Sequence, residues 1–242
     1  MIPHALNGLT YVERLYCYAE CEHTSQVAKR LKEKPLKGFY VLQTDILTSG
    51  HEILSDTRGG FWVSFVVRLH NERPLTFYVQ AAALAMQVVL GQYTDRSNVQ
   101  IGWPNELWCN KKIVGFIRGE HFPGDDTTAI IGFELFINVF PDQIKSGLEE
   151  HYTTMLAETG NCQTIGTTLR IVAEEFDKNI HLTGNLLNHD YNKHLYGRGQ
   201  NVIIDGVCGT LDRIDENGVA CLNADGKYIE VASGTCTYNN RM

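Results

Sequence analysis

The chain has 242 residues, of which 43% are hydrophobic and 20% are charged, and its formal net charge is −7. This composition is ordinary for a globular protein, and the length allows one large domain or one domain with a small module. The acidic balance argues against a nucleic-acid partner, which needs a basic face. The longest apolar run, residues 81–90, is too short to span a membrane, so we expect a cytoplasmic protein without a membrane partner.

Seven cysteines are scattered along the chain without a C-x-x-C pair or a histidine at metal-binding spacing. We expect reduced thiols that pack mostly as small hydrophobic side chains, and no protein-bound metal site. Cys17 and Cys21 would share one face if that segment were helical, but further ligands for a metal are missing there.

The first part of the chain predicts two helices and two strands. A helix begins near Thr24 or Ser25, either of which can cap it. Aromatic and β-branched residues predict strands over 38–45 and 61–69. The clearest helix follows over 74–93, with a proline at its start and a broad apolar face. We expect this helix to pack across a sheet.

The middle of the chain predicts a hairpin. Apolar residues alternate over 99–109, and a second strand is expected over 112–120, with a tight turn between the two. Within the first strand, Trp103, Pro104 and Asn105 predict a bend, because proline removes a backbone donor and restricts the residue before it.

After the hairpin we expect a central strand over 127–140 that is apolar on both faces. Pro141 is predicted to open one helix, and residues 164–180 form another with apolar positions at helical spacing. From Gly199 the pattern changes to short strands with hairpin turns, which together predict a small SH3-like barrel. Its strands are expected over 201–204, 209–214, 219–222 and 227–232.

Two motifs resemble those of a known family. The run Trp103-Pro104-Asn105-Glu106, followed after a short turn by Lys112-Ile113-Val114-Gly115, is similar to the W-P-N-[DE] and K-[IVL]-[VA]-G signature of biotin protein ligases. Ile137, Asn138 and Val139 match part of the family's G-I-G-I-N-V-N strand. The motifs and the predicted elements follow the family's order along nearly the whole chain.

The resemblance implies an α+β fold with a mixed β-sheet backed by helices, as in class II synthetase-like ligase domains. A catalytic domain over 1–195 and a C-terminal SH3-like barrel over 196–242 are expected, without the DNA-binding domain of repressor-type ligases. The implied activity is activation of biotin with ATP and Mg²⁺, followed by transfer to a lysine of a biotin carboxyl carrier protein. A homodimer is also implied, as for some ligases.

The same resemblance implies roles for individual side chains. Lys112 is the expected catalytic residue, which meets the biotin carboxylate and the activated phosphate. Thr24 is expected to contact the biotin head group, and Gly50 is expected to contact biotin as well. The residues expected to contact the adenylate are Trp103, Asn105, Glu106, Asn138 and Arg58.

The loop over 48–60 departs from the family pattern, because His51 and Glu52 stand where the family carries arginines. Concentrated guanidinium charge is what holds a phosphate-bearing intermediate. A second hypothesis is therefore a ligase-like protein that binds biotin, a related acyl group or a carrier domain without adenylation. Transfer of lipoate or octanoate is a third hypothesis. Further departures from the family pattern are Leu47, Gly102, Glu134, Phe136 and Phe140.

Each candidate side chain also has a purely structural explanation. Thr24 can act as a helix cap, Arg58 as a surface turn residue, and Asn138 as a partner of neighbouring backbone groups. Lys112 can belong to a solvated lysine pair at the hairpin turn. Whether a basic side chain reaches the phosphate position decides between the hypotheses.

Overall fold

The computed structural model describes residues 4–70 and 73–238. Seven strands form the larger sheet in the order β1-β2-β3-β7-β6-β5-β4, and their bounds are β1 Val12–Cys21, β2 Phe39–Leu47, β3 Phe61–Arg68, β4 Val99–Gly102, β5 Glu106–Cys109, β6 Lys112–Phe122 and β7 Asp125–Leu135. β1 and β2 are parallel, whereas all other neighbours are antiparallel. The sheet is therefore mixed, as predicted.

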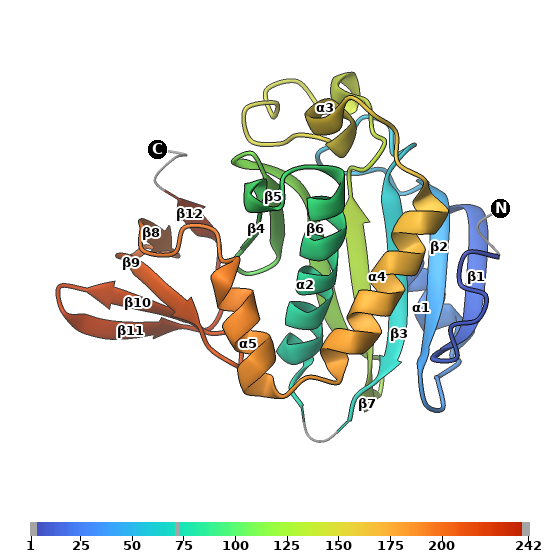
Figure 1. The fold of residues 1–242 in the computed structure, drawn as a ribbon, viewed down its shortest axis with the longest axis horizontal. Helices are drawn as coiled ribbons and strands as arrows, with labels where there is room; N and C mark the ends of the chain where they lie inside the picture. The colour runs from blue at the N-terminus through green and yellow to red at the C-terminus, as the bar shows by residue number, and fades with distance from the viewer. Residues whose placement is uncertain (1–3, 71–72, 239–242) are drawn as a thin grey trace.

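Helices cover both faces of this sheet, and their bounds are α1 Thr24–Leu31, α2 Leu75–Tyr93, α3 Met155–Thr159, α4 Ile165–Ile180 and α5 Gly184–Lys193, with short turns η2 Arg96–Asn98 and η3 Pro141–Gln143. α2 and α4 pack against each other on one face, and α1 lies on the opposite face (Figure 1). Side chains alternate along β2, so Phe39 and Val41 join the core under α2 and α4. Tyr40 and Leu42 point the other way and pack against α1. Burial of both faces explains why β2 is apolar almost throughout.

The helix α2 is long and apolar enough to cross a membrane by length and composition alone, but 67% of that window is buried inside the protein. Its buried side chains face the sheet on one side and α4 on the other. It therefore packs as the core helix of the fold, as the sequence predicted.

The C-terminal part of the chain forms a second, antiparallel sheet in the order β11-β10-β9-β8-β12, with bounds β8 Asn201–Ile204, β9 Val207–Ile214, β10 Ala220–Ala224, β11 Lys227–Val231 and β12 Cys236–Tyr238. Hairpin turns connect β9 to β10 and β10 to β11, as predicted, and a further hairpin turn connects β8 to β9. Within the described residues the hydrogen-bonded order does not close, so an SH3-like barrel stays a prediction, as does the division of the chain at residue 196.

The two sheets meet at the bend that follows β4. The indole N–H of Trp103 donates to the carbonyl oxygen of Gly218 at 2.7 Å, and its backbone N–H donates to the hydroxyl of Tyr238 at 2.9 Å. Beside them, Trp108 stacks on Tyr196 with ring centroids 4.0 Å apart. Aromatic side chains from both sheets therefore form one buried joint.

Several predicted elements differ from the structure. The expected strand over 99–109 is two strands, β4 and β5, which pair with each other across the bend at Trp103, Pro104 and Asn105. The expected strand over 127–140 ends at Leu135. Beyond that point the carbonyl of Phe136 accepts from the backbone N–H of Met155, so the chain has left the sheet.

The helix predicted from Pro141 is wrong. Only η3 forms, and the backbone then bonds to distant segments: Lys145 N–H donates to Ile53 O, and Ile113 N–H donates to His151 O. Gly147, with φ of +88°, further interrupts a helical path. The sequence analysis also did not predict β1, α5 or β12. Cys17 and Cys21, which would share a face only in a helix, lie in β1.

Candidate functional site

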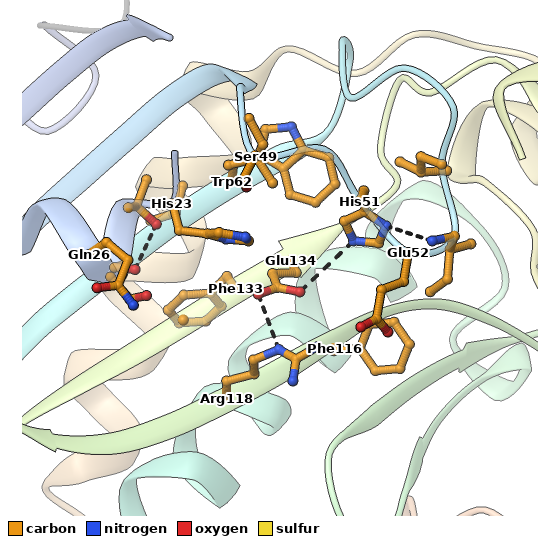
Figure 2. A pocket seen from close by; sticks show the side chains of 18 of the residues that line it. His23, Gln26, Ser49, His51, Glu52, Trp62, Phe116, Arg118, Phe133 and Glu134 are labelled. Atoms are coloured by element: carbon orange, nitrogen blue, oxygen red, sulfur yellow. Dashed lines mark hydrogen bonds and ion pairs between the residues drawn. The ribbon is translucent and has the colours of Figure 1, made fainter. Parts of the chain in front are cut away.

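An open cavity of about 1190 Å³ lies on the α1 face of the larger sheet, under the loop over 48–60 (Figure 2). Its walls come from the start of α1, the loop, and the strands β3, β6 and β7. Because α2 and α4 fill the other face, the sheet serves as a rigid floor with the core behind it.

Strand register determines which side chains reach this floor. Glu134 on β7 lies opposite Trp62 on β3 and Phe116 on β6. One row further, Gly132 lies opposite Ser64 and Arg118. Residues two apart share one face of a strand, so both rows point into the cavity. At Gly132 an added Cβ would make only ordinary van der Waals contacts, the nearest with Arg118 Cβ at 3.8 Å, so the floor is not crowded there.

One end of the cavity carries a pair of hydroxyl groups. The side-chain oxygens of Thr24 and Ser64 lie 2.7 Å apart, and both residues are buried. Thr24 is the first residue of α1, but the helix has no side-chain cap. The capping explanation for Thr24 therefore does not apply, and its hydroxyl is directed towards the sheet.

The other end carries a charged cluster of Arg118, Glu134 and His51, which lie next to one another in Figure 2. Arg118 Nε donates to Glu134 Oε1 at 3.1 Å, and His51 Nε2 lies 3.9 Å from Glu134 Oε2. The side chains of His51 and Glu134 are only 6% and 16% exposed. We call these three residues the Glu134 cluster.

The protonation state of His51 follows from its contacts. The backbone N–H of Ile53 donates to His51 Nδ1 at 3.1 Å, so Nδ1 is the acceptor and the ring hydrogen lies on Nε2, facing Glu134. Burial lowers the pKa of His51 below its ordinary value, against the opposite influence of Glu134. A neutral imidazole that presents an N–H to the cavity is the result.

The cavity has no excess of positive charge. Its lining has three cations and three carboxylates, namely Lys29, Arg118 and Lys145 against Glu52, Glu120 and Glu134. Each cation already has a partner: Lys29 Nζ lies 2.6 Å from Glu120, Lys145 Nζ donates to the carbonyl of His51 at 2.7 Å, and Arg118 bonds Glu134.

This donor set has no excess of positive charge, whereas a nucleotide triphosphate needs clustered cations to neutralise its oxygens. Nor do the described residues contain a group of three or more His, Cys, Asp or Glu side chains that could hold a metal ion. A small uncharged or singly charged ligand suits the lining better.

The loop over 48–60 is anchored by apolar side chains. Ile53 and Leu54 are buried in a small second core with Trp62, Phe136 and Ile144. Thr57 holds the loop base, because its hydroxyl accepts from the backbone N–H of Leu47 at 2.9 Å. Phe136 is fully buried there, so it occupies space that a glycine would leave open. The loop is thus packed onto the protein.

Of the sequence-predicted site residues, the structure brings three to the cavity: Thr24, Gly50 and Asn105. Lys112 does not line it, and its Nζ donates to the carbonyl of Glu149 at 2.7 Å. The expected roles of these residues stay predictions.

The other predicted adenylate contacts lie outside the cavity lining. Asn138 is engaged at both ends of its amide by the backbone of Gln163, at 2.8 and 2.7 Å. Arg58 is an exposed partner of Asp56 at 3.3 Å. Glu106 accepts from the indole of Trp108 at 2.9 Å, and Trp103 is buried in the joint between the sheets. Their predicted roles are likewise untested.

Sequence reasoning did not propose Arg118, Ser64 or Lys145 as site residues, and it treated His51 and Glu134 only as departures from a motif. A signal was present, since Ser64, Arg118 and Glu134 are polar residues next to apolar stretches of their strands. Such residues at positions that alternate towards a buried face indicate a cavity or a paired charge.

Comparison with known proteins finds no matching family model and no matching curated sequence. Solved structures do match. A biotin protein ligase from Aquifex aeolicus gives a TM-score of 0.78 at 18% identity over 94% of this chain and 99% of that chain. A biotin protein ligase-like protein of unknown function from Silicibacter gives 0.70 at 14% identity, over 92% and 95%. The Leishmania major biotin protein ligase with biotinyl-5-AMP gives 0.61 at 15% identity, over 91% and 99%.

The arrangement is thus an α+β domain with a ligand-sized cavity on one sheet face, followed by a small antiparallel sheet. At these similarities the chain has the biotin protein ligase fold.

Proposed function

We propose that this protein is a biotin protein ligase-like protein whose cavity binds biotin or a related acyl ligand without activating it with ATP. The observation that carries the proposal is the charge balance of the cavity, in which three cations face three carboxylates and each cation makes a hydrogen bond or ion pair. The fold supplies the pocket, while the lining does not supply the excess of cationic groups that a triphosphate requires.

In this proposal the ligand lies on the open floor above Gly132. The hydroxyls of Thr24 and Ser64 offer hydrogen bonds at one end, and the Glu134 cluster offers them at the other. Asn105 lines the same cavity and its amide can both donate and accept. An elongated ligand with two polar ends matches this arrangement.

A second candidate is a complete biotin--carboxyl-carrier protein ligase. It is favoured by Lys112, which the hairpin of β5 and β6 fixes at the start of a strand, and by Asn105 in the cavity. A biotin carboxyl carrier protein would then be the partner, with ATP and Mg²⁺ as cofactors. A cytoplasmic location, a homodimer, a 1–195 ligase domain and an SH3-like barrel over 196–242 belong to this reading.

Isothermal titration calorimetry with biotin, repeated with ATP and Mg²⁺ and followed by mass spectrometry, tests the proposal. We expect biotin to bind without ATP, its affinity to stay unchanged when ATP and Mg²⁺ are added, and no biotinyl-adenylate to form. Detection of the adenylate would reject the first candidate in favour of the ligase. If biotin, lipoate and octanoate all fail to bind, both candidates are rejected.

Lys112→Ala separates the two candidates further. Because Lys112 does not line the cavity, the first candidate predicts a biotin affinity within about twofold of the unaltered protein. The ligase candidate predicts loss of adenylate formation. Lys111→Ala is the matched control, since Lys111 is the exposed neighbouring lysine in the same turn.

A further inference from the structure

We propose that the edge strand β1 of the larger sheet pairs antiparallel with β1 of a second copy of this chain, around a twofold axis that passes beside Cys17. The two larger sheets then form one continuous sheet across the dimer. The residues of β1 do not line the cavity, so the inference does not depend on which candidate function is correct. It rests on the backbone geometry and the side-chain pattern of β1.

The strand β1 is an open edge of the larger sheet. Among the residues that the structure describes, it forms a ladder only with β2, and it lies at the outer margin of the sheet in Figure 1. The other edge strand, β4, is covered: Ile101 N–H donates to His194 O at 2.8 Å, and Ile101 O accepts from Tyr196 N–H at 2.8 Å. A ten-residue edge presents a row of backbone groups that favours pairing with another chain.

The direction of these backbone groups can be assigned. The carbonyl of Cys21 accepts from the backbone N–H of Thr48, directly after β2, so the backbone groups of Cys21 face β2. The register with β2 is continuous from Arg14 to Cys21, and backbone groups alternate in direction along a strand. The residues whose N–H and C=O face away from the sheet are therefore Arg14, Tyr16, Tyr18 and Glu20.

The side chains of β1 repeat in reverse order about Cys17. Antiparallel pairing centred there places Arg14 opposite the partner subunit's Glu20, and Tyr16 opposite the partner subunit's Tyr18. The twofold axis makes each of these pairs occur twice. Opposite charges and aromatic rings that face each other directly across two strands stabilise a sheet. This charge complementarity identifies a second copy of the chain as the occupant of the edge.

The charged side chains are accessible to a partner. The side chain of Arg14 is 55% exposed and forms an ion pair with Glu33 of its own chain. A guanidinium group has five N–H donors, so it can bind a second carboxylate. Glu20 is exposed as well, and α1 packs over β2, β3 and β7, which leaves it set back from the β1 edge. On the opposite face of β1, Leu15 lies opposite the partner subunit's exposed Ala19.

Neighbouring registers pair these side chains less well. Pairing centred on Tyr16 places Arg14 opposite a tyrosine and Glu20 opposite a valine. Pairing centred on Tyr18 places Arg14 opposite Glu22, which lies beyond the end of β1 and already forms an ion pair with Arg30. The register around Cys17 joins both charged residues within β1.

Sedimentation equilibrium of the full chain tests the pairing, and a monomer–dimer equilibrium is expected. Arg14→Glu and Glu20→Arg should each raise the dimer Kd roughly tenfold or more, because each creates two like-charged pairs per dimer. The double variant should restore the Kd to within about threefold, since it exchanges the two charges. Glu22→Arg is the matched control, which should change the Kd by less than about twofold. Thermal unfolding of each variant verifies the fold.

Cross-linking tests the register directly. The backbone groups of Cys17 face β2, so the two copies of Cys17 form a non-hydrogen-bonded pair with Cα atoms about 4.5 Å apart, which a disulfide can span. Copper(II)–phenanthroline, which takes the two electrons from the two thiols, is expected to give a linked dimer on a non-reducing gel. Cys17→Ser should abolish the link, whereas Cys208→Ser, which removes another exposed thiol, should not.

Three results would each overturn the inference. The first is a chain that stays monomeric at about 0.1 mM. The second is a dimer whose Kd is insensitive to Arg14→Glu and Glu20→Arg, or more sensitive to Glu22→Arg. The third is a dimer that the oxidant does not link, or one whose link survives Cys17→Ser. In each case the proposed function stands, because ligand binding in the cavity is measured separately.

Discussion

At the scale of single residues, His51 has an unusual position for an ionisable side chain in a loop. Its ring lies 5.4 Å from that of Trp62 and 5.5 Å from that of Phe136, and it is nearly inaccessible to solvent. Among the neighbouring charged and titratable groups, Glu134 raises the pKa of His51, whereas Arg118, His23 and Lys145 lower it. Burial outweighs the attraction of Glu134, so the folded protein keeps the ring neutral at a pH where the unfolded chain binds a proton.

This difference makes stability depend on pH. The folded pKa of His51 lies below its ordinary value of 6.5, so the stabilisation is complete above about 6.5 and is lost as the pH falls through the folded pKa. His51→Gln should flatten the decrease in unfolding free energy between about pH 7 and pH 5.

Urea unfolding at a series of pH values measures this effect. His181→Gln is the control, since the His181 side chain is 73% exposed and lies on α4, away from the cavity. Equal slopes for His51→Gln and the unaltered protein would contradict the assignment of a neutral, buried ring.

At the scale of elements, the loop over 48–60 depends on one close backbone approach. Gly59 has φ of +84°, and an added Cβ would lie 2.3 Å from the carbonyl oxygen of Asn138. Asn138 is also hydrogen-bonded to the loop, because its backbone N–H donates to the carbonyl oxygen of Gly59 at 2.7 Å. The loop and the segment that follows β7 can therefore approach this closely only with glycine at position 59.

Gly59→Ala should destabilise the protein by more than about 2 kcal/mol, because a backbone clash adds to the roughly 1–2 kcal/mol cost of a left-handed alanine. Gly206→Ala is a matched control, since Gly206 has the same φ of +84° with no heavy atom within 4 Å of the added Cβ. Equal losses for the two variants in chemical denaturation would show that the close approach has no energetic weight.

Elements with a strong local pattern were predicted well from sequence. β2, β3, β6, α2 and α4 have apolar periodicity over eight or more residues, and their positions were confirmed. The segment after Pro141 has helical spacing too, but its backbone bonds to β6 and to the loop, which no local pattern encodes. β1 was not predicted because its burial is partial and its polar positions are irregular.

Only the cavity residues that belong to a local sequence motif were predicted as site residues. Thr24 at a helix start and Asn105 in the bend were both singled out and both line the cavity. The Glu134 cluster, in contrast, joins β6, β7 and a loop, and it depends on cross-strand register. The turn between β6 and β7 sets the register of that hairpin, but neither composition nor spacing places the loop residue His51 beside β7.

At the scale of the whole molecule, the two sheets are joined by hydrogen bonds to Trp103. Tyr238→Phe removes the acceptor of the buried Trp103 backbone N–H and should lower the free energy of unfolding by about 1–3 kcal/mol. Tyr228→Phe, in the same sheet but 65% exposed, should change it by less than about 0.5 kcal/mol. Guanidinium unfolding monitored by circular dichroism compares the two, and equal effects would contradict a stabilising role for the joint.

The three tryptophans of the chain have different surroundings. Trp103 and Trp108 lie in the joint, away from the cavity, whereas Trp62 lines the cavity wall next to His51. Indole emission depends on local polarity, so a ligand that enters the cavity changes the emission of Trp62 and leaves a constant background from the other two. The molecule therefore carries its own optical reporter of occupancy, and ligand binding can be followed in the unmodified protein without a label.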